Sequence, residues 1–298
     1  MILKIFGSLF ILFVIFLLVA DQFVQFRLSD KELTRFFTKH HIPGSIHYYT
    51  AGGRKMRYIS IGDDSLPVLV FIHGSPASLS IYTDYYKDTA LINHFKMLAV
   101  DRPGYGYSGL GKPVQSIQQQ AKMISPILDS LCKIKRPVMV MGGSYGTSVA
   151  CRLAMDYPQL VDGLVLVAPS LAPGEETTYS ISYAAALPAI NWFVPRMLQS
   201  ANEEKLTHKT ELQKMVPLWK NIKVPVIYLQ GENDELIDTS NASFARNHLV
   251  NAPYLSIEFI KNETHVIAYS AQKLIKKKIF EMEALLQKRK EFWGPAKE

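Results

Sequence analysis

The stretch VMVMGGSYG, residues 138–146, decides how the rest of the sequence is interpreted. Its first four residues form a continuous apolar run, as expected of a strand that is covered on both faces. The glycines that follow predict a tight strand-to-helix turn around Ser144, because larger side chains there would clash with neighbouring backbone. Such a turn holds a hydroxyl clear of the sheet. G-x-S-x-G is a weak pattern alone, but between a predicted strand and a predicted helix it makes Ser144 a candidate nucleophile, with an idle serine in a glycine-rich turn as the alternative.

Apolar runs of the same kind recur on both sides of this stretch. They lie at residues 67–72, 97–100, 164–167, 226–229 and 255–260, and residues 56–61 alternate like an edge strand. Helical patterns lie between them at residues 81–93, 116–132 and 144–156. Strands and helices that alternate at this spacing predict right-handed crossovers and a mostly parallel central sheet flanked by helices. The sequence therefore indicates the α/β class.

Residues 171–221 interrupt this alternation. Helical patterns at 179–187, 190–198 and 203–216 occupy the interval, and no strand pattern does. We interpret it as a helical cap over the carboxyl ends of the strands, where open α/β sheets bind their ligands. A second membrane segment at 181–198 is the competing interpretation, against which Pro188, Asn191 and Pro195 argue.

The N-terminus predicts a membrane segment. Residues 5–20 are almost unbroken apolar sequence between Lys4 and Asp21. Sixteen residues fall slightly short of a hydrocarbon core of about 30 Å, so residues 1–25 are either a transmembrane anchor or a signal segment. We favour the anchor, because Leu18 is bulky for position −3 of a cleavage after Ala20. Residues 26–44 are expected to form a juxtamembrane helical linker.

The charges around this segment point to opposite sides of the membrane. A short N-terminus with one lysine favours export of the rest of the chain. The basic residues that follow the apolar run favour retention of that flank in the cytoplasm; they are Arg27, Lys31, Arg35 and Lys39. We expect the catalytic domain on the extracytoplasmic, periplasmic side.

Composition limits the classes of partner. The net charge is +7, with basic runs at residues 276–278 and 288–290. Apolar residues interleave with these runs at helical spacing, which indicates the solvated face of a helix, and no nucleic-acid-binding motif accompanies them. The histidines and the two cysteines lack metal-ligand spacing, and no phosphate loop or dinucleotide fingerprint occurs. We predict no nucleic-acid partner, no metal and no cofactor; loose attraction to acidic lipid headgroups stays open.

A second motif, HGSP at residues 73–76, follows the predicted strand at 67–72 directly. Acyl transfer passes through a tetrahedral oxyanion that requires two N–H donors already in position. The backbone N–H groups of Tyr145, after the candidate nucleophile, and of Ser75 are the candidate donors. His73 is interpreted as a structural residue that holds this loop.

Together with DRPGYGYS at residues 101–108, these motifs resemble the α/β-hydrolase superfamily, in its serine esterase- and lipase-like members. The resemblance covers about residues 45–285. It implies a core of residues 45–170 and 222–298, with the helical cap of residues 171–221 inserted after the sixth strand. It also implies a structural role for Asp101 in the turn at 101–108.

The resemblance further implies an acid and a histidine, in that order along the chain, after Ser144. The turn GEND at residues 231–234 closes the strand at 226–229 and points to Asp234, with Asp238 as the alternate. His265 follows the last predicted strand, where the family keeps its base. Members of the family often have glycine after this histidine, whereas this chain has Val266.

These residues predict a serine hydrolase that cleaves carboxylic esters through an acyl-enzyme. The apolar cap and the N-terminal segment favour a small-molecule ester or a lipid-like substrate. A proline iminopeptidase-like aminopeptidase or amidase is the alternative, with the acidic pairs at 175–176 and 203–204 as candidates to hold an amine. A non-catalytic binding protein on the same fold is the alternative of another class. No motif indicates the oligomeric state.

Overall fold

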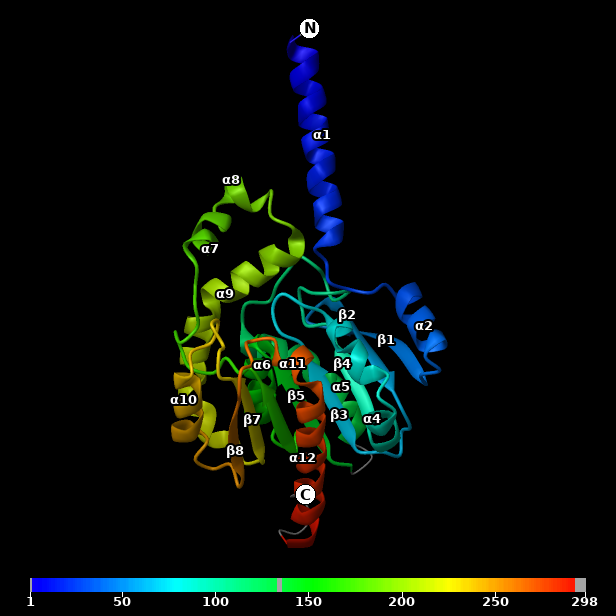
Figure 1. The fold of residues 1–298 in the computed structure, drawn as a ribbon, viewed down its shortest axis with the longest axis vertical. Helices are drawn as coiled ribbons and strands as arrows, with labels where there is room; N and C mark the ends of the chain where they lie inside the picture. The colour runs from blue at the N-terminus through cyan, green and yellow to red at the C-terminus, as the bar shows by residue number, and fades with distance from the viewer. Residues whose placement is uncertain (1, 133–135, 293–298) are drawn as a thin grey trace.

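A single eight-stranded sheet forms the centre of the computed structural model, which describes residues 2–132 and 136–292 (Figure 1). The strands are β1 (Gly44–Ala51), β2 (Arg54–Ile61), β3 (Val68–Ile72), β4 (Lys96–Val100), β5 (Val138–Gly143), β6 (Gly163–Val167), β7 (Val226–Gly231) and β8 (Leu255–Ile260). Their order in the sheet is β1-β2-β4-β3-β5-β6-β7-β8. The β1–β2 and β2–β4 pairs are antiparallel, and the other neighbours are parallel. The predicted α/β class and mostly parallel sheet are confirmed.

The antiparallel edge of the sheet departs from the sequence-based expectation. β1 was not predicted, and it displaces β2 from the edge by pairing with it along its whole length. Gly52 and Gly53, with φ of +57° and +69°, form the two-residue turn between the strands. Two residues with positive φ are what a tight hairpin turn requires, and glycine adopts that conformation without a steric penalty.

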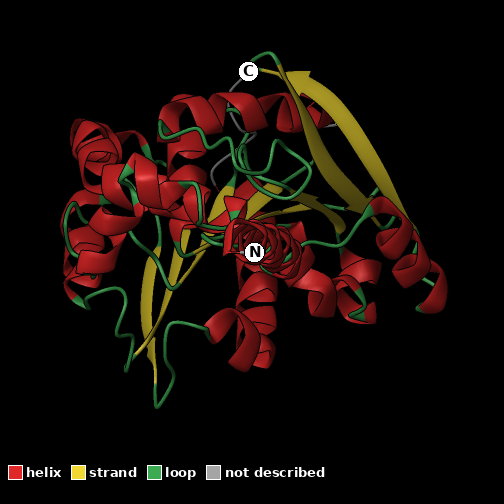
Figure 2. Cartoon of the chain, turned by 90° about the horizontal axis from the view of Figure 1, so that it is seen from above, coloured by secondary structure: helices red, strands yellow, loops and turns green. Residues whose placement is uncertain are grey.

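Helices cover both faces of the sheet (Figure 2). On one face, alternate strand residues such as Val68 and Val70 pack with α5 (Ile117–Cys132), α6 (Tyr145–Asp156) and α10 (Ser240–His248). On the other face, Leu69 and Phe71 pack with α2 (Asp30–Lys39), η1 (Leu79–Tyr82), α3 (Thr83–Tyr86), α4 (Thr89–His94), α11 (Ile267–Ser270) and α12 (Gln272–Phe292). Burial of each large apolar side chain contributes about 1.5–3 kcal/mol to the free energy of folding. The period-two alternation of the strands therefore divides the core into two layers.

The helix predicted at residues 81–93 is divided into η1, α3 and α4. α3 ends at Tyr86, and the side chain of Asp88 accepts a hydrogen bond from the N–H of Leu91 at 3.1 Å to begin α4. An aspartate at this position favours a new helix start over continuation of the old one.

The interval at residues 171–221 contains α7 (Ser180–Ala185), α8 (Pro188–Asn191), α9 (Arg196–Met215) and η2 (Val216–Asn221). The structure assigns helices here, and none of the eight named strands runs through it. α9 is continuous from Arg196, where the sequence pattern suggested separate pieces. Pro195 precedes its first turn, a place where proline is compatible with a helix. In Figure 1 these helices lie at the end of the sheet toward which α1 also extends.

The N-terminal segment forms a long helix followed by a shorter one, α2, which lies within the expected linker at residues 26–44. α1 (Ile2–Phe23) extends away from the body of the molecule (Figure 1), and α2 begins after Ser29. The Ser29 side chain accepts from the N–H of Glu32, and the Glu32 carboxylate accepts from the N–H of Ser29, which is a capping box. Across the described residues, no helix has the combination of length and apolar character that crossing a membrane requires. The expected transmembrane segment at residues 1–25 is thus without support.

Asp101 connects the turn at residues 101–108 to the rest of the core. One carboxylate oxygen accepts from Arg57 Nε and from the N–H of Tyr107, both at 2.8 Å, and the other accepts from the N–H of Leu79 at 2.9 Å. The side chains of Asp101 and Arg57 are fully buried. Loss of the carboxylate would leave a buried guanidinium without its main counter-charge and two N–H groups without acceptors.

We expect Asp101→Ala to lower the free energy of unfolding by about 3 kcal/mol, because removing one partner of a buried ion pair strands the other. In a chain of this size the melting temperature should fall by about 5–10 °C. Thermal unfolding followed by circular dichroism measures the shift. Asp64→Ala is the matched control, since that carboxylate is 81% exposed and pairs with Lys96 at the surface. A melting temperature equal to that of the control would contradict the structural role of Asp101.

Candidate active site

Ser144 occupies the turn between β5 and α6 in a strained conformation. Its φ is +49° and its ψ is −124°, a region that residues other than glycine seldom adopt. The N–H of Ser144 donates to the carbonyl of Val167 at 2.9 Å, which ties the turn to the end of β6. A Cβ on Gly146 would lie 2.3 Å from the carbonyl oxygen of Ile72, so only glycine allows α6 to begin this close to β3. The predicted turn is present, and backbone packing explains its glycines.

Three side chains from separate elements form a hydrogen-bonded chain at this turn. His265 Nε2 lies 2.9 Å from Ser144 Oγ, and His265 Nδ1 lies 2.8 Å from Asp234 Oδ2. Ser144 follows β5, Asp234 follows β7, and His265 follows β8. Since parallel strands end at one edge of the sheet, residues 121 positions apart in the chain come into contact.

The environment of Asp234 fixes the orientation of its carboxylate. Oδ1 accepts from the N–H groups of Leu236 and Ile237, both at 3.0 Å, which leaves Oδ2 for His265. The Asp234 side chain is fully buried, whereas that of His265 remains 17% exposed. The carboxylate is therefore held by the backbone, and the imidazole edge stays accessible from outside.

Asp238, the alternate acid, lies elsewhere. It is exposed, and its carboxylate accepts from the N–H of Ser240 at 2.8 Å, at the start of α10. That hydrogen bond holds the pKa of Asp238 below its ordinary value. The structure joins Asp234, and not Asp238, to His265.

The two candidate N–H donors flank Ser144. Tyr145 is the first residue of α6, and Ser75 lies in the loop after β3. This loop passes directly over the turn, because a Cβ on Gly74 would lie 3.0 Å from Ser144 Cβ. In the described part of the chain, neither the Ser75 N–H nor the Tyr145 N–H has an acceptor assigned. The residues next to the Ser144 turn thus carry two N–H groups to which the described structure assigns no acceptor.

His73 supports this loop and takes no part in the chain of Ser144, His265 and Asp234. The N–H of Arg102 donates to His73 Nε2 at 2.9 Å, so the ring proton is on Nδ1, which lies 2.7 Å from the carbonyl oxygen of Gly74. Full burial, followed by the nearby charge of Arg102, lowers the pKa of His73 well below 6.5 and keeps it neutral. The structural interpretation of His73 agrees with these contacts.

The family model for the alpha/beta hydrolase fold matches residues 67–215, half of the chain. The chain belongs to this family. The match includes the loop after β3, the turn at Ser144 and most of the cap. As an alpha/beta hydrolase, the chain has the mostly parallel α/β fold that its sequence predicts.

Individual proteins similar to this alpha/beta hydrolase vary in their named substrates. A 2-hydroxy-6-oxononadienedioate/2-hydroxy-6-oxononatrienedioate hydrolase from a Pseudomonas species is 31% identical over 146 residues, which cover 47% of this chain and 46% of that protein. The match therefore spans about half the length of this curated relative.

Solved structures resemble the chain over more of its length but at low identity. A putative aryl esterase from Burkholderia cenocepacia has a TM-score of 0.69 at 17% identity, covering 82% of this chain and 100% of its own. A membrane phospholipase A, described as a bacterial virulence factor, has a TM-score of 0.68 at 16% identity, covering 96% of this chain and 99% of its own. At these identities the likeness establishes the fold.

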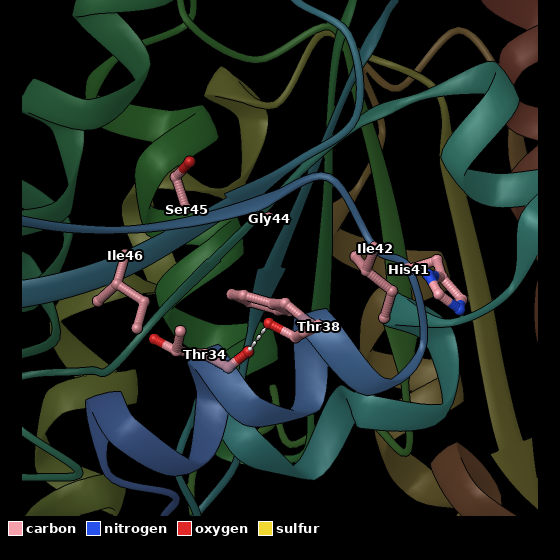
Figure 3. Close-up of a pocket in the computed structure, with 8 residues that line it drawn as sticks. Thr34, Thr38, His41, Ile42, Gly44, Ser45 and Ile46 are labelled. Atoms are coloured by element: carbon pink, nitrogen blue, oxygen red, sulfur yellow. Dashed lines mark hydrogen bonds between the residues drawn. The ribbon is translucent and has the colours of Figure 1, made fainter.

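Two surface hollows lie near the N-terminal part of this alpha/beta hydrolase. One of about 620 Å³ lies between α2 and the start of β1 (Figure 3), and none of the predicted site residues lines it. The other, of about 550 Å³, lies between the segment at 26–28, Pro76 and Tyr269. Pro76 follows Ser75, and Tyr269 is on α11, which begins two residues after His265. The second hollow therefore borders the loop that carries Ser75.

Sequence-based reasoning named Glu176 and Glu204 only as candidates to hold an amine, and it missed the buried polar contacts that α9 makes with the core. Glu204 and His208 are fully buried. Glu204 pairs with Arg102 at 2.7 Å, and His208 Nδ1 lies 3.0 Å from Glu176, which also bonds to Ser170. Burial alone would raise the pKa of Glu176, but His208 and its other partners lower it to about 2. The four-residue spacing of Glu204 and His208 was the available signal, although such spacing more often marks a solvent-exposed face.

Proposed function

We propose that this protein is a serine hydrolase that cleaves carboxylic esters by two-step acyl transfer. The observation that carries the proposal is the chain Ser144–His265–Asp234, with contacts of 2.9 and 2.8 Å, beside the N–H groups of Ser75 and Tyr145. A nucleophile, a base and an orienting carboxylate in hydrogen-bonded sequence form the recurring arrangement for acyl transfer.

In the first step Ser144 Oγ attacks the ester carbonyl carbon while His265 Nε2 accepts the hydroxyl proton. Asp234 holds the proton of His265 on Nδ1 and stabilises the imidazolium. The N–H groups of Ser75 and Tyr145 bind the oxyanion that forms. When the tetrahedral intermediate collapses, the bond to the leaving oxygen breaks and His265 returns its proton to the departing alcohol.

The second step repeats these roles with water as nucleophile. His265 accepts a proton from water as the hydroxyl oxygen attacks the acyl-enzyme carbonyl, and the same N–H groups bind the second oxyanion. Collapse breaks the bond to Ser144 Oγ, which recovers its proton from His265. The products are a carboxylic acid and the free enzyme.

A hydrophobic acyl group suits the surroundings of the site. The hollow between residues 26–28, Pro76 and Tyr269 is lined largely by apolar side chains, among them Phe26, Leu28 and Ile81. Apolar walls favour an alkyl or aryl chain over a charged one. We infer that the substrates are esters of hydrophobic or lipid-like acids, which a series of p-nitrophenyl esters of increasing chain length would rank.

The aminopeptidase alternative requires acidic side chains that are free to bind a substrate amine. Each acid proposed for that role has a partner within the protein. Glu204 binds Arg102, and Glu176 contacts His208 and Lys205. Glu175 accepts from Ser240, and Glu203 accepts from Gln115. These pairings favour esters over amides with a free amino terminus.

The proposal is tested by labelling the purified protein with a fluorophosphonate, which phosphonylates an activated serine. Wild type should be labelled, and His265→Ala should lose the label because Ser144 then has no base within reach. Parallel incubation with p-nitrophenyl esters and with prolyl amides separates the ester and aminopeptidase alternatives. Folded wild type that takes no label and turns over neither substrate would favour a non-catalytic binding protein.

We also propose that the N-terminal helix and the cap contact a lipid surface. Exposed apolar side chains surround the described part of α1, including Leu12 at 62% and Phe16 at 64%, and continue onto the cap at Trp192, also 62%. The rings of Phe13 and Phe193 lie 5.7 Å apart, so the two elements share one apolar surface. A helix that is apolar all round, rather than along one stripe, suits lipid better than a single protein partner.

We expect the wild-type protein to float with phosphatidylcholine vesicles in a density gradient. Leu12→Glu combined with Phe16→Glu should release most of it into the dense fraction, because a charge on each exposed apolar position opposes insertion among acyl chains. Lys31→Glu on α2 is a control that changes charge away from this apolar surface. If the wild type, the double variant and Lys31→Glu all floated to the same extent, the proposed lipid contact would be contradicted.

A further inference from the structure

One face of the cap helix α9 is polar and yet buried against the core. Ser200, Glu204, His208 and Glu211 follow one another at intervals of four, four and three residues, and all four are buried. Residues at these intervals lie on the same side of a helix. Buried charges are costly unless they are paired, so this face must have specific partners beneath it.

Glu204 is at the centre of these contacts. Its Oε1 accepts from Arg102 Nη1 at 2.7 Å and from Gln120 Nε2 at 2.8 Å. Its Oε2 accepts from Arg102 Nη2 at 3.0 Å and from the Tyr105 hydroxyl at 2.6 Å. Both oxygens of a fully buried carboxylate are therefore satisfied by the loop that follows β4 and by α5.

Arg102 transmits this contact to the loop that carries Ser75. Nη2 of Arg102 donates to the carbonyl of Gly74 at 2.9 Å, and Nε donates to the carbonyl of His73 at 2.8 Å. The carbonyl of Gly74 and the N–H of Ser75 belong to one planar peptide unit, so fixing one fixes the direction of the other. A cationic donor on that carbonyl also polarises the peptide and strengthens its N–H as a donor.

Tyr105 reaches the same residue by a second route. Its hydroxyl donates to Glu204 and lies 2.7 Å from Ser75 Oγ. Glu204 thus restrains both the peptide and the side chain of Ser75.

His208, one turn along α9, stacks on the ring of Tyr145 with centroids 4.3 Å apart, beside the second N–H donor. The Arg102 guanidinium lies 4.6 Å from the centre of that ring.

We propose that α9 sets the geometry of the oxyanion hole, with Glu204 as a positioning residue that acts through Arg102 and Tyr105. The proposal rests on the proposed esterase activity, because the two N–H groups matter for catalysis only if an oxyanion forms between them. Glu204 touches no reacting atom. Its contribution is the orientation of the Ser75 N–H toward developing negative charge.

Glu204→Gln tests this with a change of charge at nearly constant shape. We expect kcat for p-nitrophenyl butyrate to fall by about tenfold while KM changes less than twofold. Loss of a whole oxyanion donor lowers kcat by about 10²–10³-fold, and the effect here should be smaller because the donor is only misplaced. Inhibition by butaneboronic acid, which forms a tetrahedral serine adduct, should weaken by a similar factor. Glu203→Gln changes the neighbouring position, where the carboxylate accepts from Gln115 at the surface, and it should behave as wild type.

Amide hydrogen exchange over residues 73–80 separates this proposal from the proposed function. Faster exchange in Glu204→Gln, with no change in Glu203→Gln, supports the restraint even if wild type shows no turnover, in which case the esterase proposal alone fails. Unchanged exchange, or wild-type kcat in folded Glu204→Gln, overturns the role of Glu204. If Glu204→Gln does not fold, Tyr105→Phe takes its place, because it removes only the hydroxyl between Glu204 and Ser75. The kcat of Tyr105→Phe should fall while its KM stays unchanged. A wild-type kcat for this variant would again overturn the proposal.

Discussion

Replacing Ser144 by alanine is expected to lower kcat for p-nitrophenyl esters by about 10⁶-fold, because the acyl-enzyme cannot form without the hydroxyl. KM should change little, since Ser144 Oγ contributes to the transition state more than to substrate binding. The measurement is initial-rate kinetics with protein purified away from host esterases. Any activity left over reports what the N–H groups of Ser75 and Tyr145 do for attack by water alone.

Ser65→Ala is the matched control for Ser144→Ala, since Ser65 is an exposed serine in the loop between β2 and β3. It should keep wild-type kcat and full fluorophosphonate labelling. If Ser144→Ala retained more than about one hundredth of the activity, the nucleophile would have to be another residue. The strained φ of Ser144 would then need an explanation outside catalysis.

Asp234→Asn is expected to lower kcat by about 10⁴-fold with little change in stability. The amide oxygen can still accept from the N–H groups of Leu236 and Ile237, but its NH₂ group then faces His265 Nδ1. That arrangement favours the tautomer with the proton on Nε2, which cannot accept a proton from Ser144. Kinetics together with a crystal structure of the variant would show whether the geometry is retained.

Asp238→Asn serves as the control because the same chemical change is made four residues away, at an exposed carboxylate. It should keep wild-type kcat, because its amide oxygen can still accept from the N–H of Ser240 at the start of α10. Should Asp238→Asn lose activity while Asp234→Asn keeps it, the role of the acid would pass to Asp238. A similar loss in both variants would indicate that the loop between β7 and α10 acts as a unit.

The inner strands of the sheet could be predicted because they are short and apolar on both faces, so their composition alone distinguishes them. β1 lacks this property. Its residues are only partly buried, and the pair Gly52-Gly53 was the one local indication of the hairpin. The division of residues 81–93 into three helical pieces was also missed, because the periodicity of apolar residues continues across the break at Asp88.

At the candidate site, Ser144 was predicted from its glycine-rich turn after a strand, and Asp234 and His265 were implied by the resemblance to the α/β-hydrolase superfamily. The contacts of Glu204 were not predicted, since they join residues 102 positions apart through a cap whose placement no local pattern encodes. A glutamate followed four residues later by a histidine resembles an exposed helix face. Only the structure reveals that this face is turned toward Arg102 and Tyr145.

The buried face of α9 also limits how this enzyme can be altered. A cap of this kind suggests an engineering strategy in which the whole cap is exchanged to change substrate preference, while the core is kept to provide reactivity. In this protein substrate preference and reactivity cannot be separated in that way. A transplanted cap without an acid at the position of Glu204 would leave Arg102 buried without its carboxylate partner. Diversification of the cap is therefore better confined to α7, α8 and the outer side of α9, where a change of specificity does not carry a change of rate with it.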